Sequence, residues 1–241
     1  MQKIKIFRLG PIKDCEVDIS NFMILTGPQA SGKSTLAKSI FFFKNVKNIL
    51  FEQIKRKHLM NGVSDIISMS CEKRMLREIR AIFLQTFGTT WCMDNEMKLQ
   101  YFYGDEKWIK ISLKPDPLRP NYIWIDMSPD IKRFLNNIEN YKKKEEWGLR
   151  EQSLRNTIYS FFEDEMEIVY IPAGRSLITL FSDQLNYVYG SMDDMQKRNL
   201  DYCTQNYLER ILRLKTVFTS SYTQMIMNQI QLTDKRMERA F

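Results

Sequence analysis

The clearest pattern of hydrophobic and polar positions lies at the start of the chain, where alternation gives way to a continuous apolar run. Ile4 and Ile6 alternate with polar residues up to the break at Gly10, and a second alternating run covers Cys15–Ile19. Alternation with a period of two predicts half-buried strands. The run Phe22–Thr26 that follows is apolar at nearly every position, which predicts a strand buried on both faces.

Helical and strand patterns alternate along the rest of the chain. Apolar residues recur at helical spacing from Leu36 onward and again over 65–87, and both stretches predict long helices. Further strands are predicted at 99–103, 108–111, 122–126 and 167–171, and helices at 130–165 and after Ser176. We therefore expect an α/β fold in which residues 1–241 form a single ATP-binding domain and residues 115–165 are a helical insertion within it.

Composition narrows the class of protein. The chain has 241 residues, of which 44% are hydrophobic and 27% charged, as in an ordinary globular protein. No apolar run approaches the roughly 18 residues that cross a bilayer, and the alternating N-terminus does not match a signal peptide. We therefore predict a cytoplasmic protein with no membrane partner. The formal net charge of +7 is compatible with a nucleic-acid partner, but its dispersion is also that of ordinary helix surfaces.

The cysteines and the histidine do not predict a metal centre. The four cysteines form no C-x-x-C pair, and the chain has one histidine, His58. Zinc sites need several such ligands at short spacings, so none can be assembled here. We interpret the cysteines as reduced residues that fill the core, and His58 as part of a solvated basic face.

The segment Gly27–Thr35 carries the strongest chemical signal. Its sequence fits the phosphate-loop pattern G-x-x-x-x-G-K-[ST] at every fixed position, and a predicted strand and helix flank it. In such a loop two glycines allow a tight turn and close approach of the backbone, and successive N–H groups face the anion. The pattern predicts that ATP binds with Mg²⁺, held by the following residues: Gly27, Pro28, Gln29, Ala30, Ser31, Gly32, Lys33, Ser34 and Thr35.

Three of these side chains have specific expected roles. We expect Lys33 to bridge the β- and γ-phosphates, Ser34 to be the metal ligand, and Thr35 to meet the α-phosphate. The chain lacks the N-K-x-D motif of guanine-specific switches, so a GTPase is not expected. Small-molecule kinases usually begin with the phosphate-loop strand, whereas two strands precede it here, and no lid rich in arginine is evident. A P-loop kinase is therefore a less favoured alternative.

The stretch Ile4–Ile40 resembles the beginning of the ABC-type ATPases that include the recombination protein RecF, the SMC chromosome proteins and the OLD-type nucleases. Phe7-Arg8 matches the aromatic and basic residues that end their first strand, and Gln29-Ala30 replaces the usual Asn-Gly of their loop. Residues 170–176 are similar to a strand-turn motif of bacterial members found in mobile or defence systems. The resemblance implies a P-loop NTPase with an ABC-ATPase-like mixed sheet, and it implies that Arg8 can reach the nucleotide, although a solvated strand arginine is equally expected.

In these ATPases two heads enclose two ATP molecules between the phosphate loop of one head and an L-S-G-G-Q-like signature of the other. This sequence has no such signature and no Walker B strand ending in Asp-Glu. The nearest match, Tyr122–Asp126, is followed by Met127, so we interpret Asp126 as a cap of the next helix. The resemblance therefore implies either the N-terminal part of an ATPase head or a degenerate head, with poor hydrolysis in both cases.

Few other residues have a predicted role. Gln85 and Gln100 are candidates for the glutamine that contacts magnesium, and Arg175 is a candidate for contact with a nucleotide or partner. The function expected from the resemblance is ATP-gated dimerisation, with a second copy or a partner chain that supplies the remaining motifs, controlling DNA or a nuclease. The alternative is a non-catalytic module that binds ATP and dimerises.

Overall fold

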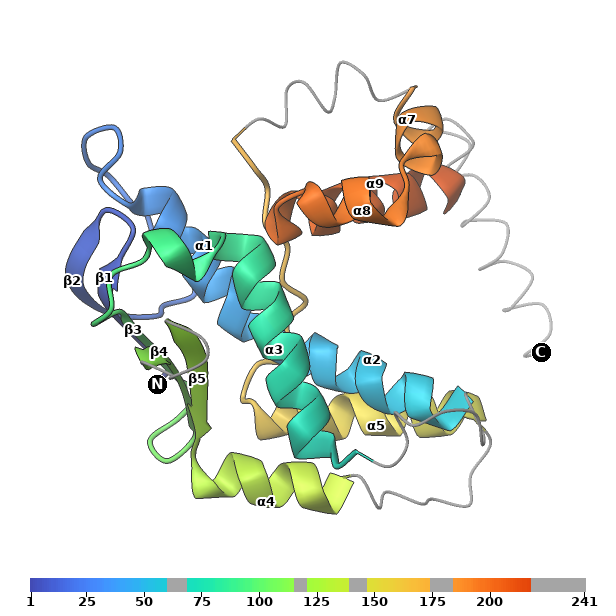
Figure 1. Cartoon of the computed structure of the whole chain (residues 1–241). Coiled ribbons are helices and arrows are strands. Elements are labelled where there is room, and N and C mark those ends of the chain that lie inside the picture. The colour runs from blue at the N-terminus through green and yellow to red at the C-terminus, as the bar shows by residue number, and fades with distance from the viewer. Residues whose placement is uncertain (60–68, 115–120, 139–146, 174–183, 218–241) are drawn as a thin grey trace. The chain divides into compact units, whose positions relative to one another are not determined.

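The structure is a computed structural model that describes residues 1–59, 69–114, 121–138, 147–173 and 184–217 (Figure 1). The chain divides into two compact units, Met1–Val169 and Tyr170–Phe241. The described part of the first unit contains a five-stranded sheet and the helices that pack on it. Its strands are β1 (Lys3–Leu9), β2 (Ile12–Asp18), β3 (Lys98–Phe102), β4 (Trp108–Lys114) and β5 (Tyr122–Met127).

The five strands form one antiparallel sheet in the order β2-β1-β3-β4-β5. Ile6 of β1 lies opposite Cys15 and Leu99, so the alternating apolar residues of neighbouring strands share one face. On that face Ile4, Ile6 and Leu99 are buried. The strands predicted from this alternation are therefore confirmed. Every described pairing is antiparallel, so the described residues form an α/β fold but not the expected mixed sheet.

Residues at the helix ends explain where helices of the first unit begin and end. They are α1 (Lys33–Lys44), α2 (Val46–Leu59), α3 (Cys71–Phe87), α4 (Pro129–Ile138) and α5 (Trp147–Phe161). The single long helix expected after the loop is interrupted at Asn45, whose side-chain oxygen accepts a hydrogen bond from Asn48. The side chain of Ser70 caps α3 by accepting a hydrogen bond from the N–H of Lys73, and Gly88 with φ 87° ends it.

Two of the predicted strands are wrong. Residues 22–26 and 167–171 have no strand structure, and Phe22 and Ile24 are 80% and 72% exposed. A strand requires a neighbour that accepts its hydrogen bonds, and none of the described strands pairs with either segment. Their apolar composition alone therefore does not make them strands.

The turn after α5, which we call the clamped turn (Phe161–Met166), is fixed by side chains from three other segments. The Nζ of Lys47 donates to the carbonyl oxygens of Asp164 at 2.6 Å and Met166 at 2.5 Å, and it lies 3.1 Å from the Asp164 carboxylate. The amide of Gln2 donates to two further carbonyl oxygens of the turn, and the ammonium of Lys107 donates to a fifth, that of Phe161. Burial lowers the pKa of Lys47, and the nearby Asp164 carboxylate opposes that shift.

An aromatic chain connects α1, the sheet and the clamped turn. The rings of Phe43 and Tyr101 stack with centroids 5.2 Å apart, and Tyr103 contacts Tyr101 on one side and Phe162 on the other. The hydroxyl of Tyr103 donates to the carbonyl of Phe43, and that of Tyr101 donates to the side chain of Gln2. Burial raises the pKa of both phenols above the ordinary value of 10.0.

Residues 184–217, in the second unit, are mainly helical, as the sequence predicts. They contain α7 (Leu185–Ser191), α8 (Asp194–Asn199) and α9 (Tyr202–Val217). Asp193 and Gln196 form a reciprocal capping box at the start of α8. The hydroxyl of Tyr189 donates to Glu209 and so joins α7 to α9, and burial raises the pKa of this phenol to about 12. Among the helices that the structure describes, none has the length and apolar character needed to cross a membrane.

Replacing Lys47 by Met should destabilise the chain by about 3 kcal/mol, because the change leaves the buried Asp164 carboxylate and two carbonyl oxygens of the turn without their main donor. Lys55 is the matched control on the same helix, since its ion pair with Glu151 is partly exposed and Lys55→Met should cost less than about 1 kcal/mol. Urea unfolding of both variants measures the difference. Equal losses would contradict the importance of the clamped turn.

Stability should fall as the pH rises above 10. Folding raises the pKa of Tyr101 and Tyr103, so the unfolded chain releases these two protons at a lower pH than the folded chain does. The free energy of unfolding then falls with pH by up to about 1.4 kcal/mol per pH unit for each tyrosine. Urea unfolding between pH 8 and pH 11 measures the slope in parallel with the double variant Tyr101→Phe, Tyr103→Phe. An unchanged slope in the variant would refute this assignment.

Candidate nucleotide-binding site

The backbone of the predicted phosphate loop has the conformations that its glycines permit. Gly27 and Gly32 have φ values of 147° and 95°, in the region that L side chains rarely adopt. Gly32 is also buried, and a Cβ at this position would lie 2.6 Å from Cγ1 of Ile12. The loop therefore packs directly on the β1–β2 hairpin, and this contact requires glycine. Ala30 has a φ of 61° without that freedom, at the position where the resembled ATPases have Gly.

Lys33 closes the loop on itself. Its Nζ donates to the carbonyl oxygens of Gly27 at 2.7 Å and Pro28 at 2.5 Å, and to the hydroxyl of Ser31 at 3.3 Å. These bonds join the start of the loop to the first residue of α1. They hold a positive charge against the loop, while Pro28 to Ser31 stay exposed to solvent.

The N-terminus of α1 adds donors to the same place. Gly32 is the N-cap and offers no side chain, and the first turn contains no acidic residue. The N–H of Leu36 makes the first hydrogen bond within the helix, to Gly32, so the N–H groups of Lys33, Ser34 and Thr35 have no partner in the helix. Free N–H groups and the helix dipole favour an anion here.

A hollow of about 780 Å³ begins where the loop ends. Thr35, the last residue of the loop motif, lines it together with Lys38 one turn further along α1. The β1–β2 hairpin forms a second side, with Gly10 close to the Thr35 hydroxyl, and the end of α3 contributes Phe87. The volume lies in the range of small-molecule pockets. Spacing along α1 could have found Lys38, but Phe87 is brought here only by the packing of α3.

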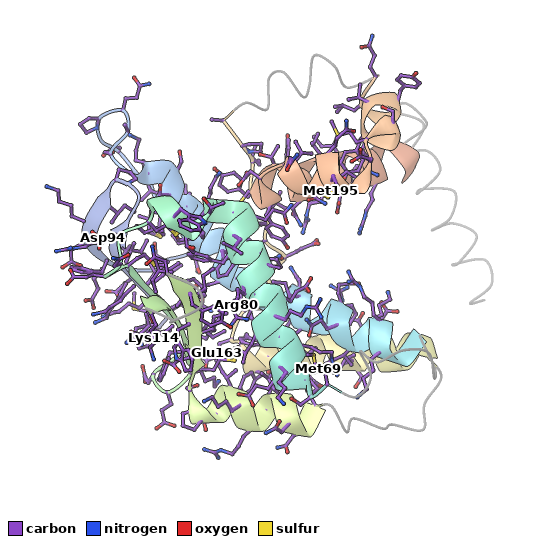
Figure 2. The ribbon with its side chains drawn as sticks, viewed as in Figure 1. Met69, Arg80, Asp94, Lys114, Glu163 and Met195 are labelled. Atoms are coloured by element: carbon purple, nitrogen blue, oxygen red, sulfur yellow. The ribbon has the colours of Figure 1, made fainter. Side chains whose placement is uncertain are left out.

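Arg8 lines this hollow, but two carboxylates hold it. Its guanidinium lies 3.3 Å from Asp94 and 2.7 Å from Glu96, and it covers the ring of Phe7. Figure 2 shows Asp94 beside the β1–β2 hairpin. The backbone of Arg8 has a φ of 51°, which turns the chain at the end of β1. Arg8 is therefore near the predicted site, and its contact with a nucleotide stays a prediction.

A magnesium ion at this loop would have to be held mainly by phosphate oxygens. Among the described residues no group of three or more His, Cys, Asp or Glu side chains could hold a metal. Mg²⁺ commonly takes one or two protein ligands and completes its shell with water and phosphate. The exposed Ser34, in the first turn of α1, is the loop residue that suits this role.

The other candidate residues lie elsewhere. Asp126 is on β5, separated from β1 by two strands, and Gln100 lies on β3, on the sheet face away from the helices. Neither residue lines the hollow. The cap of α4 is Ser128, whose hydroxyl accepts from the N–H of Ile131, so the capping role expected of Asp126 is wrong.

Three candidates remain. Gln85 is in the last turn of α3 and does not line the hollow. His58 is in the last turn of α2, and Arg175 lies outside the described residues. Of the cysteines, Cys71 and Cys203 are buried as free thiols, in agreement with the interpretation of core-filling residues.

Comparison with known proteins identifies no relative. No protein-family model matches the chain, and no curated protein and no solved structure is significantly similar to it.

Ala30→Gly should leave the chain equally stable or raise its stability by up to about 1 kcal/mol, because glycine relieves the cost of a positive φ. The control is Ala37→Gly inside α1, which should cost about 1 kcal/mol through the lower helix propensity of glycine. Urea unfolding of both variants tests the loop conformation. A loss at Ala30 as large as that at Ala37 would show that Ala30 does not have this conformation.

Proposed function

We propose that the chain binds ATP with Mg²⁺ at Gly27–Thr35. The observation that carries the proposal is the closed loop itself, with Lys33 bonded to the carbonyls of Gly27 and Pro28 at the uncapped N-terminus of α1. This arrangement joins a fixed positive charge to a row of free N–H groups. Such a combination suits the phosphates of a nucleotide.

The hollow beside Thr35 supports a nucleotide over a free phosphate. The end of the loop, where the α-phosphate is expected, opens into a volume large enough for a nucleoside. Phe7 and Phe87 offer apolar surface, and Lys38 offers a donor, within the same walls. Ser34 and the phosphates would together hold Mg²⁺, which neutralises phosphate charge.

The wider role that we propose is that of an ABC-type ATPase head of the RecF, SMC and OLD-like sort. ATP-gated dimerisation, with a second copy or a partner chain, would control a nucleic acid or a nuclease. The exposed segment 22–26 supports this proposal, because its apolar residues Phe22 and Ile24 face solvent and it immediately precedes the loop. Apolar surface of this kind needs cover from a further element.

A non-catalytic module that binds ATP is the second candidate. The position of Asp126 favours it, because this nearest match to a Walker B carboxylate lies on β5 and the loop packs on the β1–β2 hairpin, with two strands between β1 and β5. Phosphoryl transfer depends on the positioning of water and metal. The two candidates share the ATP site and differ in turnover.

Lys33→Ala should weaken ATP binding by about tenfold to a hundredfold, since a hydrogen bond to a charged group contributes about 1.5–3 kcal/mol. Titration with a fluorescent ATP analogue in the presence of Mg²⁺ measures the affinity. Lys132→Ala, at an exposed position of α4, removes the same charge away from the loop and should bind as the wild type does. Equal binding by the Lys33 variant and the wild type would refute the site.

Phosphate release by the same samples separates the two candidates. Binding without turnover favours the module or a head that requires its partner. Turnover that Asp126→Asn leaves unchanged would favour an ATPase whose catalytic carboxylate is another residue.

A further inference from the structure

The sheet has a second face, turned away from the helices of its own unit. Figure 1 shows α1, α2, α3 and α5 of the first unit on one side of the sheet. The other side carries the intervening residues of each strand. On β3, β4 and β5 these include three aromatic residues and three lysines, which we call the aromatic–lysine face: Phe102, Trp108, Trp124, Lys98, Lys110 and Lys114.

Aromatic rings and lysines occupy neighbouring cross-strand positions on this face. Phe102 lies opposite Trp108, and Ser112 lies between Lys98 and Trp124 in one cross-strand row. The Nζ of Lys114 lies 4.1 Å from the ring centroid of Trp124 (Lys114 is labelled in Figure 2), and the Nζ of Lys98 lies 5.9 Å from that of Phe7. Trp124 is 42% exposed, so its ring is accessible to solvent.

The charge of this face is not neutralised. Lys3 and Lys5, on β1, form ion pairs with Glu16 of β2 at 3.0 Å. In contrast, none of the three lysines of the aromatic–lysine face forms an ion pair within the part of the chain that the structure describes. Asp126 lies opposite Lys110 in the register. The strands β3, β4 and β5 contain no other acidic residue.

We propose that the aromatic–lysine face binds single-stranded nucleic acid. The exposed ring of Trp124 can stack with an unpaired base, and flanking lysines neutralise the phosphates that connect such bases. A duplex keeps its bases stacked inside and offers no base face to Trp124. A protein partner fits less well, because lysine is depleted in protein–protein interfaces and this surface carries three lysines.

Single-stranded nucleic acid on this face is the nucleic-acid partner of the proposed function, and the assignment therefore rests on that function. The surface itself uses none of the residues at Gly27–Thr35. Binding of nucleic acid without ATP therefore tests the face separately from the ATP site.

The experiment measures binding of the full chain to fluorescein-labelled dT15, U15 and a 15-base-pair DNA duplex by fluorescence anisotropy without ATP. The wild type should bind at least one single strand more tightly than the duplex, and the comparison of dT15 with U15 distinguishes DNA from RNA. Trp124→Ala should weaken this binding by about tenfold, whereas Trp124→Phe, which keeps a ring, should retain most of it. Trp124 is exposed, so both variants should fold, and circular dichroism checks this.

Lysine variants test the electrostatic contribution to nucleic-acid binding. The triple variant Lys98→Ala, Lys110→Ala, Lys114→Ala should lower the slope of log affinity against log salt by about 2, since each phosphate contact on a single strand contributes about 0.7. Lys132→Ala, on α4, is the control for loss of a surface lysine, and Lys33→Ala should bind nucleic acid as the wild type does.

Two outcomes would overturn the proposal. One is that the wild type does not bind single strands at 50 mM salt or binds the duplex equally well. The other is that Trp124→Ala and the triple variant bind as the wild type does. Loss of ATP binding in Lys33→Ala with nucleic-acid binding intact would support both sites. A wild type that binds one of the two ligands and not the other identifies which proposal has failed.

Discussion

The buried ammonium of Lys47 is the contact on which the first unit depends. A charged group can stay in an apolar interior only when hydrogen bonds and an opposite charge replace the water that it loses. Asp164 and the carbonyl of Met166 supply these partners, and the ring of Tyr159 lies 4.6 Å from the ammonium. The same turn is held by Gln2 and Lys107, so helix and sheet meet at one set of backbone carbonyls.

This clamp also positions the phosphate loop. Helix α1 begins at Lys33 in the loop and ends at Lys44, whose ammonium lies 3.3 Å from the Asp164 carboxylate. One short helix therefore has the loop at one end and the clamped turn at the other. At the loop end, the contact of Gly32 with Ile12 leaves no room for a side chain. Fixed at both ends, α1 presents its free N–H groups in a defined place next to the hollow.

Local sequence predicted the strands that have neighbours and failed for those that have none. The alternation around Ile4 and Ile6 gave the correct faces because each residue meets an apolar partner across the sheet. The apolar run at 22–26 is at least as hydrophobic, yet it is exposed and irregular. Strand formation depends on a partner far away in sequence, which no local pattern contains.

The sequence by itself determined the phosphate-loop pattern, its lysine and the helix that follows, because these depend on residues within one short segment. It also determined which strand positions are apolar. Only the tertiary structure decided that Arg8 is held by Asp94 and Glu96, that Phe87 shares a hollow with Thr35, and that Trp124 and Lys114 share an uncovered face. Such contacts join residues separated by ten to eighty positions or more, and packing of whole elements, rather than local propensity, brings them together.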